Sequence, residues 1–260
     1  WSGAATVTSS NAYTYVTPPT ITSFTPTTNL TSGGGTVTLT GNNLTNTTQV
    51  TIGGVVASDV TVNSSTQVTF TVPAGTAGPS TVALSTALGG TTSNSGTFRY
   101  IEAPMITSVT PTVGPIAGGT TVTITGTNLA NTTSVTVGGV AGTALTNLSS
   151  TSVSFTTAVS GVGGLRDIVL ETYSGVGSAT SSGAFRYVSA PTITSITPSA
   201  GPVAGGNSVT ITGTNLTNTT SVSFGSTPAT SFSNVSDTQV TAVVPTFGSS
   251  TPVSVSVQTY

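Results

Sequence analysis

The feature that most constrains the fold of this chain is an internal repeat. The segment PPTITSFTP begins at Pro18, APMITSVTP at Ala103 and APTITSITP at Ala190. Each of these segments opens a unit of about 85 residues, and a fixed period of this kind is the sign of a tandem array. The sequence therefore predicts three successive copies of one small fold.

Each copy continues with a glycine-rich turn and an alternating run, which reads GGGTVTLTGNNL from Gly33, GGTTVTITGTNL from Gly118 and GGNSVTITGTNL from Gly205. Alternation of apolar residues with threonine places the apolar side chains on one face of a strand. More short β-branched runs follow, bounded by Gly, Pro or Asn, and no stretch carries the 3.6-residue period of a helix. We therefore expect an all-β chain in which every copy is a β-sandwich.

The repeated pattern resembles a known family. Residues 104–129 and 191–216 follow P-x-I-x-S-φ-x-P-x-x-G-P-x-x-G-G-x-x-V-T-I-x-G-x-N-L, in which φ is apolar, and this pattern is similar to that of the IPT/TIG family. The first copy departs from it, because Asn29-Leu30 replaces Gly-Pro, but it keeps Gly33 and Gly34. The resemblance implies three immunoglobulin-like sandwiches like those of plexins and some transcription factors. It implies no single function, because one fold hosts many functions.

The ends of the repeats predict a circular offset. The third copy stops at PVSVSVQTY, whereas the second continues with SGVGSATSSGAFRYV, residues 174–188, as its last strand. Residues 2–16, SGAATVTSSNAYTYV, match that strand without a gap, with Tyr13 on Phe185 and Tyr15 on Tyr187. We therefore expect three whole modules opened within a hairpin. Their predicted parts are a donor strand (1–18), module 1 (19–103), module 2 (104–190) and module 3 without its final strand (191–260).

A sandwich that lacks a strand exposes an unpaired backbone ladder and part of its core, which favours association. The N-terminal strand of one subunit is then expected to complete module 3 of the next, which is donor-strand complementation. The residues expected to mediate self-assembly are Val7, Tyr13, Tyr15 and Val16. Three modules joined in line would hold the two chain ends about 100 Å apart. Head-to-tail contact that does not close generates an open filament, so the predicted partner is the chain itself.

The last strands of the first two copies share the tripeptide Phe-Arg-Tyr around Arg99 and Arg186. Strand alternation points the aromatic rings inward and the guanidinium groups outward. The favoured interpretation is an edge strand protected by charge. The alternative is a contact between modules.

Charge excludes several classes of function. The chain has three basic and five acidic residues and a net charge of −2, and it contains no His and no Cys. Nucleic-acid binding is not expected, because binding requires a basic patch. Membrane insertion is not expected either, because no apolar run reaches about 18 residues. The nearest carboxylate pair, Asp167 and Glu171, would be about 13 Å apart on a strand, too far for glycosidase chemistry. No catalytic, cofactor-binding or metal site is predicted, and the chain is not expected to be an enzyme.

Ser and Thr make up more than a third of the chain, which favours an extracellular or cell-surface location. Asn-Thr-Thr recurs after the Asn-Leu turn of each copy, at Asn46, Asn131 and Asn218. These asparagines are candidate glycosylation sites, which would make glycans possible partners. They are equally explained as turn residues that tolerate a left-handed φ.

Three functions are compatible with these features. The first is the structural subunit of an extracellular filament or sheath, and the second is a spacer or adhesive stalk within a longer cell-surface or secreted protein. The third, a carbohydrate-binding module, has little support, because Trp1 is the one Trp and most Phe and Tyr residues occupy inward strand positions.

Overall fold

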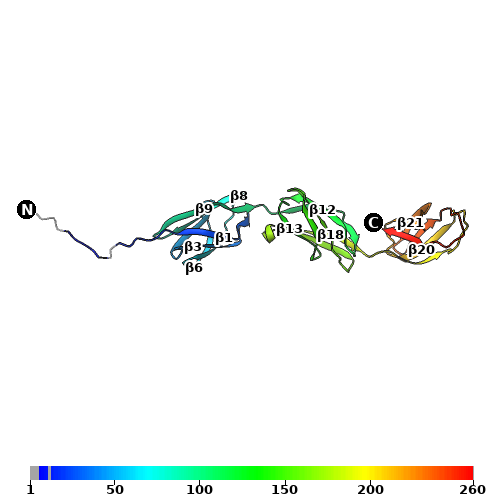
Figure 1. Ribbon diagram of the computed structural model, residues 1–260, viewed down its shortest axis with the longest axis horizontal. Helices are drawn as coiled ribbons and strands as arrows, with labels where there is room; N and C mark the ends of the chain where they lie inside the picture. Colours follow the sequence, from blue (N-terminus) through cyan, green and yellow to red (C-terminus); the bar gives the residue numbers. More distant parts are fainter. Residues whose placement is uncertain (1–5, 11–12, 260) are drawn as a thin grey trace, which may run out of the picture. The chain divides into compact units, whose positions relative to one another are not determined.

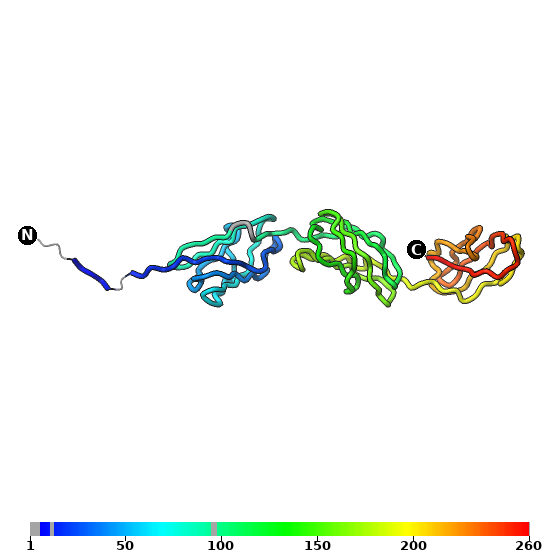
Figure 2. The backbone as a smooth tube through the Cα atoms, viewed as in Figure 1, coloured from blue at the N-terminus to red at the C-terminus, as the bar shows by residue number. Residues whose placement is uncertain are grey.

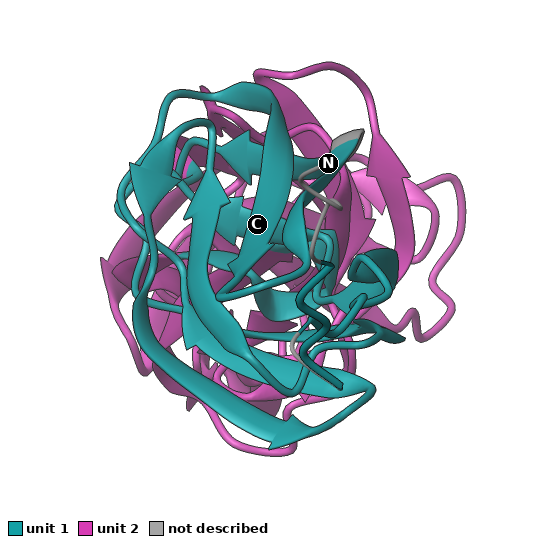
Figure 3. Cartoon of the chain, turned by 90° about the vertical axis from the view of Figure 1, so that its left-hand side faces the viewer, with its two compact units in different colours: residues 1–104, 172–178 teal, residues 105–171, 179–260 magenta. Residues whose placement is uncertain are grey.

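A computed structural model describes residues 6–10 and 13–259, apart from the side chains of residues 95–97. The expected donor strand therefore lies partly outside the described residues, which exclude 1–5 and 11–12. The chain divides into two compact units, one made of residues 1–104 and 172–178 and the other of residues 105–171 and 179–260 (Figure 3). Strands dominate both units (Figure 1), so the prediction of an all-β chain is confirmed.

Module 1 consists of two sheets packed face to face. One sheet has the strand order β1-β3-β7-β6, and the other has the order β2-β9-β8-β4-β5. The pair β2 and β9 is parallel, whereas the other neighbouring strands are antiparallel. The strands are β1 (Thr20–Thr25), β2 (Thr28–Leu30), β3 (Thr36–Asn42), β4 (Thr47–Ile52), β5 (Val55–Val56), β6 (Ser58–Ser64), β7 (Gln67–Thr71), β8 (Gly78–Thr86) and β9 (Gly90–Ile101).

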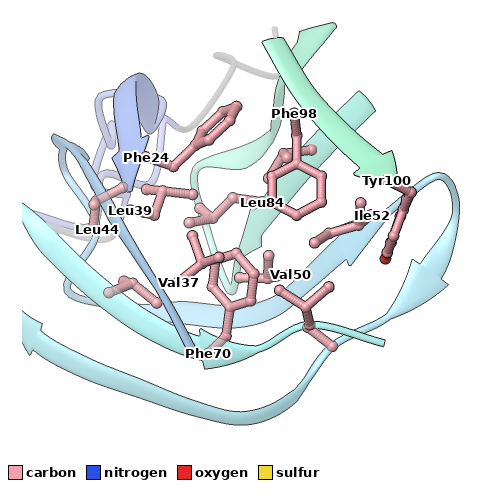
Figure 4. Packing of buried hydrophobic residues seen from close by; sticks show 14 residues of the cluster. Phe24, Val37, Leu39, Leu44, Val50, Ile52, Phe70, Leu84, Phe98 and Tyr100 are labelled. Carbon is pink, nitrogen blue, oxygen red and sulfur yellow. The ribbon is translucent and has the colours of Figure 1, made fainter. Parts of the chain in front are cut away.

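The core of module 1 follows directly from strand alternation. In β3, Val37 and Leu39 are fully buried, whereas Thr36 and Thr40 are exposed and Thr38 is half-buried. Phe98 packs 5.9 Å from Phe24 and 5.4 Å from Tyr100, measured between ring centroids, and these rings point into the space between the sheets (Figure 4). The alternation read from the sequence thus places the apolar face correctly.

Module 2 repeats this topology, with sheets ordered β10-β12-β16-β15 and β11-β18-β17-β13-β14. One 3-10 turn, Tyr173–Gly175, connects β17 to β18. The strands are β10 (Met105–Thr110), β11 (Val113–Pro115), β12 (Thr121–Thr127), β13 (Thr132–Val137), β14 (Val140–Ala141), β15 (Thr143–Asn147), β16 (Ser152–Thr156), β17 (Gly164–Thr172) and β18 (Gly177–Val188).

Module 3 keeps the first sheet, ordered β19-β20-β24-β23, but its second sheet is smaller. Among the described residues this second sheet has three strands, β22-β21-β25, against five in each of the other modules. The C-terminal strand β25 is red in Figure 2. The strands are β19 (Thr192–Thr197), β20 (Ser208–Thr214), β21 (Thr219–Phe224), β22 (Thr227–Pro228), β23 (Ser231–Ser236), β24 (Gln239–Val243) and β25 (Val255–Thr259).

The Phe-Arg-Tyr strands differ from the sequence-based interpretation in one respect. The aromatic side chains are buried and both arginines are exposed, as alternation predicts. The strands are not at an edge, however, because Arg99 of β9 pairs with Thr28 of β2, and Arg186 of β18 pairs with Val113 of β11. Protection of an edge by charge is therefore wrong, since a short parallel strand already covers that side.

Candidate functional site at an open sheet edge

Strand β25 has an unpaired side that its counterparts lack. In module 1, β8 pairs with β4 on one side and with β9 on the other, and in module 2, β17 lies between β13 and β18. Among the described residues, β25 pairs only with β21, through registers such as Phe224 with Val255 and Val222 with Val257. The other side of β25 therefore presents backbone N–H and C=O groups to which a further strand can bond.

Among the described residues, module 3 also has no counterpart of strand β11. In module 2, β11 pairs in parallel with β18 over the registers Val113–Arg186, Gly114–Tyr187 and Pro115–Val188. The corresponding residues of module 3, 200–202, form no strand. Because β11 has β18 as its sheet neighbour, a module without a counterpart of β18 also leaves the counterpart of β11 unpaired. We call the vacant strand position between β25 and residues 200–202 the slot.

The floor of this slot is apolar. Val82 and Leu84 of β8 are fully buried, as are Ile168 and Leu170 of β17. The counterparts of these residues in β25, Val255 and Val257, are only half-buried. Apolar residues of module 3 that are half-buried or exposed include Ile196, Val203, Val244, Val253, Val255 and Val257. A strand laid into the slot would remove this apolar surface from water, which is favourable.

A tyrosine anchors the last strand in each of the first two modules. The Tyr100 hydroxyl donates to the Pro73 carbonyl at 2.7 Å, and the Tyr187 hydroxyl donates to the Ala158 carbonyl at 2.9 Å. Burial of the rings removes solvent from the phenols and raises the pKa of both, so they are neutral donors. In module 3, Pro245 stands at the repeat position of the two acceptors, Pro73 and Ala158, and it is buried.

The residues expected to mediate self-assembly lie on the surface of their own chain. Val7 is 94% exposed, Tyr15 91%, Tyr13 76% and Val16 45%. The rings of Tyr13 and Tyr15 lie edge to face with centroids 4.9 Å apart, and Phe185 and its neighbour Tyr187 lie edge to face at 5.0 Å. The N-terminal segment thus carries an exposed aromatic pair with the geometry of a buried one.

The structure reveals two residues at the slot that sequence reasoning missed. Asn207 has a side-chain Oδ1 that is buried and has no hydrogen-bond partner, the one such atom among the described side chains. Phe247 is half-buried against the core of module 3, where the other modules carry Gly75 and Ser160. Alignment of the three copies could have marked both, because each is the largest residue at its repeat position.

The three candidate glycosylation sites are all exposed. Asn131 and Asn218 adopt left-handed φ values of 61° and 62°, as expected for turn residues, whereas Asn46 is not among the residues with positive φ. Thr132 and Thr219, next in sequence, each donate to a leucine carbonyl at 2.7 Å. These contacts explain the turn, and glycosylation stays a prediction.

Other polar groups form local contacts. The Asp167 carboxylate accepts hydrogen bonds from the Gly183 N–H at 2.7 Å and the Ser182 hydroxyl at 3.0 Å, which lower its pKa. Glu171 accepts from the Ser134 hydroxyl at 3.0 Å. Within residues 6–10 and 13–259, no three His, Cys, Asp or Glu residues gather as a metal site. The helical part of the described chain contains no segment long and apolar enough to cross a membrane.

Comparisons with known proteins agree with the repeat. The family model of the IPT/TIG domain matches residues 19–100, 104–187 and 191–260. Among solved structures, the chain is similar to a plexin A4 full extracellular region, with 23% identity, a TM-score of 0.44 and coverage of 93% of this chain and 22% of that chain. It is also similar to SGBP-B of Bacteroides ovatus in complex with a mixed-linkage heptasaccharide, with 23% identity, a TM-score of 0.31 and coverage of 95% and 65%.

The chain therefore spans about a fifth of the plexin chain that it matches. A search of curated proteins found no match. The three matches to the family model together extend over nearly all of the sequence, and they coincide with the three successive sandwiches of the fold. The chain belongs to the IPT/TIG domain family.

Proposed function

We propose that the chain is a structural subunit of an extracellular filament or sheath. Residues 2–16 of one copy occupy the slot of module 3 in the next copy, by donor-strand complementation. The observation that carries this proposal is the three-stranded second sheet of module 3 among the described residues, beside five strands in modules 1 and 2. The occupant is proposed because residues 2–16 align without a gap with residues 174–188, which contain β18, and about half of the positions are identical.

The registers of the complete modules support a specific register for the proposed docking. In module 1, Leu84 of β8 pairs with Thr92 of β9, and the same register places Val7 of the donor opposite Val257 of β25. On its other side, the parallel register of module 2 places Tyr15 opposite Gly201. The docked strand thus bonds to both sides of the slot.

The aromatic residues supply the binding energy. Docking buries the rings of Tyr13 and Tyr15, as Phe185 and Tyr187 are buried in module 2. Each large apolar side chain contributes about 1.5–3 kcal/mol on burial. The Tyr15 hydroxyl would donate to the Pro245 carbonyl, as Tyr187 does to Ala158. Charge has little part in this contact, because the chain has few ionised groups.

The donor strand and the slot are different surfaces of one chain, so the contact is head-to-tail. A heterologous contact of this kind builds an open filament unless its rotation closes a ring. The Ser- and Thr-rich surface supports an extracellular location, and exposed Asn46, Asn131 and Asn218 are positions for glycans. The proposed role is structural and not enzymatic.

Deletion of residues 2–16 tests this function. The deletion is expected to abolish end-to-end assembly, while modules 1 and 2 keep their folding, because each contains its own last strand. Electron microscopy of the intact and deleted chains would measure assembly, and circular dichroism would measure folding. Filaments of normal length from the deleted chain would overturn the proposal.

A spacer or adhesive stalk in a longer cell-surface protein is the second candidate. It is favoured by the way modules 1 and 2 are completed, since each uses the strand that comes next in its own chain. In a longer array, a following segment would fill the slot of module 3 in the same manner. The intact mass of the native material distinguishes the two, because a stalk predicts a species much heavier than 25.3 kDa plus glycans.

Carbohydrate binding is less well supported. The large aromatic side chains exposed among the described residues are Tyr13, Tyr15 and Phe232, and the first two are assigned to assembly. Trp1 lies outside the described residues.

A further inference from the structure

We propose that the hydroxyl of Tyr13 forms a hydrogen bond with the side chain of Asn207 in the neighbouring copy, and that this pair determines which strand module 3 accepts. The inference rests on the proposed donor-strand function and names a specificity determinant of that same site. Three observations carry it, namely an unpaired polar atom, a shared position in space and a substitution between repeats.

The unpaired atom is Asn207 Oδ1. It is buried without a hydrogen-bond partner, alone in this respect among the described side chains. A buried polar atom without a partner is unfavourable, and native proteins rarely retain one without a reason. Asn207 immediately precedes β20, and its amide lies beside Gly201, whose counterpart Gly114 pairs with the last strand of module 2.

The shared position is marked by a glycine in modules 2 and 3. A Cβ atom placed on Gly201 would lie 2.6 Å from Asn207 Oδ1 and 2.7 Å from its Nδ2. A Cβ atom on the equivalent Gly114 would lie 2.8 Å from Cζ of Phe185 and would also touch the side chain of Thr120. In module 2 the tip of the Phe185 ring and the side chain of Thr120 therefore lie at one point, and in module 3 the side chain of Asn207 lies at the equivalent point.

The substitution lies in the last strand itself. Strands β9 and β18 carry Phe98 and Phe185 at this position, and the N-terminal segment carries Tyr13. A tyrosine in the place of Phe185 adds a hydroxyl to Cζ, at the point where the Asn207 amide lies. A hydroxyl both donates and accepts, so it can bond to Oδ1 and also pair with Nδ2 if the amide is turned.

The other modules carry phenylalanine at this position of the last strand. In module 2, Thr120 stands at the position of Asn207, and its side chain lies beside the ring of Phe185. In module 1, Gly35 stands there, and the amide of Asn29 fills the space instead. A Phe-bearing strand placed in module 3 would bury the Asn207 amide unpaired, and this penalty discriminates against the wrong strand.

A double-mutant cycle in the full chain tests the pair. Tyr13→Phe removes the hydroxyl, and Asn207→Leu removes the amide while keeping nearly the same shape. The measured quantity is the lowest concentration at which the chain polymerises. Each single variant is expected to raise it about five- to tenfold, because one buried group loses its partner. The double variant is expected to return to within about twofold of the original chain, since two apolar groups then meet.

Matched controls separate this inference from the proposed function. Tyr15→Phe removes the other tyrosine hydroxyl, and its effect should combine with that of Asn207→Leu as the product of the two, because these groups do not meet. Thermal unfolding checks that module 3 of each variant is folded. If deletion of residues 2–16 abolishes assembly but Tyr13→Phe is neutral, the pair is refuted and donor-strand assembly stands. Single-variant effects that multiply in the double variant also refute the pair, and normal assembly of the deleted chain refutes both.

Discussion

Replacing Tyr15 by alanine is the most informative single perturbation of the proposed contact. Tyr15 is 91% exposed in the free chain, so its loss should leave the folding of the subunit unchanged. Its counterparts Tyr100 and Tyr187 are 1% exposed, each with its hydroxyl bonded to a backbone carbonyl. In the filament, Tyr15→Ala would therefore remove a fully buried ring and one hydrogen bond.

The expected magnitude follows from these two losses. Truncation of a buried aromatic ring to alanine costs about 3 kcal/mol or more, and a lost hydrogen bond costs about 1 kcal/mol. Because 1.4 kcal/mol corresponds to a factor of ten, the critical concentration should rise by between about a hundredfold and about a thousandfold. Tyr15→Phe keeps the ring and should raise this concentration only about fivefold.

Sedimentation of the polymer over a series of protein concentrations measures this effect. Phe232→Ala is a matched control, because Phe232 is an aromatic residue of β23, in the sheet that the slot does not belong to. Tyr187→Ala is a second control, which should lower the thermal stability of module 2 without comparable change in assembly. A Tyr15→Ala chain that polymerises at the original concentration would refute the assignment of Tyr15 to the slot.

The other predictions concern rate, pH and salt. Phe247→Ser, which introduces the residue of module 2, should speed the first step of assembly in stopped-flow light scattering. The tip of the Phe247 ring lies near Gly225 and Val253, just before β25, beside which the donor strand is proposed to dock. An unchanged rate would contradict this prediction. The pKa of Asp167 is lowered in the folded chain, so its contribution to stability is present above the usual carboxyl range and is lost as the pH falls through that range. The pKa of Tyr187 is raised, so its contribution is present below about pH 10 and is lost as the pH rises further. The melting temperature should therefore be level from about pH 5 to 9, and a fall inside that window would contradict this prediction. Filaments should persist in molar salt, because screening weakens exposed charge pairs and not a shared hydrogen-bonded core; dissolution seen by electron microscopy would oppose strand sharing.

Local pattern was sufficient to predict the strands and the inward face of each. Alternation in TVTITGT correctly placed Val122 and Ile124 in the core of module 2. The Phe-Arg-Tyr motif likewise gave buried rings and an exposed arginine. Both predictions depend only on the two-residue period of a strand, which a sequence displays directly.

The order of the strands could not be read in the same way. The sequence-based interpretation put the Phe-Arg-Tyr strand at an edge, but the residues that cover it in module 1, Thr28–Leu30, come about seventy positions earlier and pair in parallel. Such pairing leaves no local periodicity. The burial of Asn207 was hidden for a related reason, since the space it fills in module 3 is filled in module 1 by Asn29, from another strand.

The two tyrosines together resolve an ambiguity that the apolar pattern of the donor strand leaves open. A slip of one residue turns Tyr13 and Tyr15 outward and places Thr14 in the core, so that register is strongly disfavoured. A slip of two residues keeps a tyrosine facing inward, and hydrophobic burial alone distinguishes it poorly from the proposed register. Such a slip, in either direction, moves one tyrosine into the place of the other, so it would keep one of the two proposed hydrogen bonds and lose the other. Only the proposed register would form both hydrogen bonds, and a single register would give every subunit the same spacing along the proposed filament.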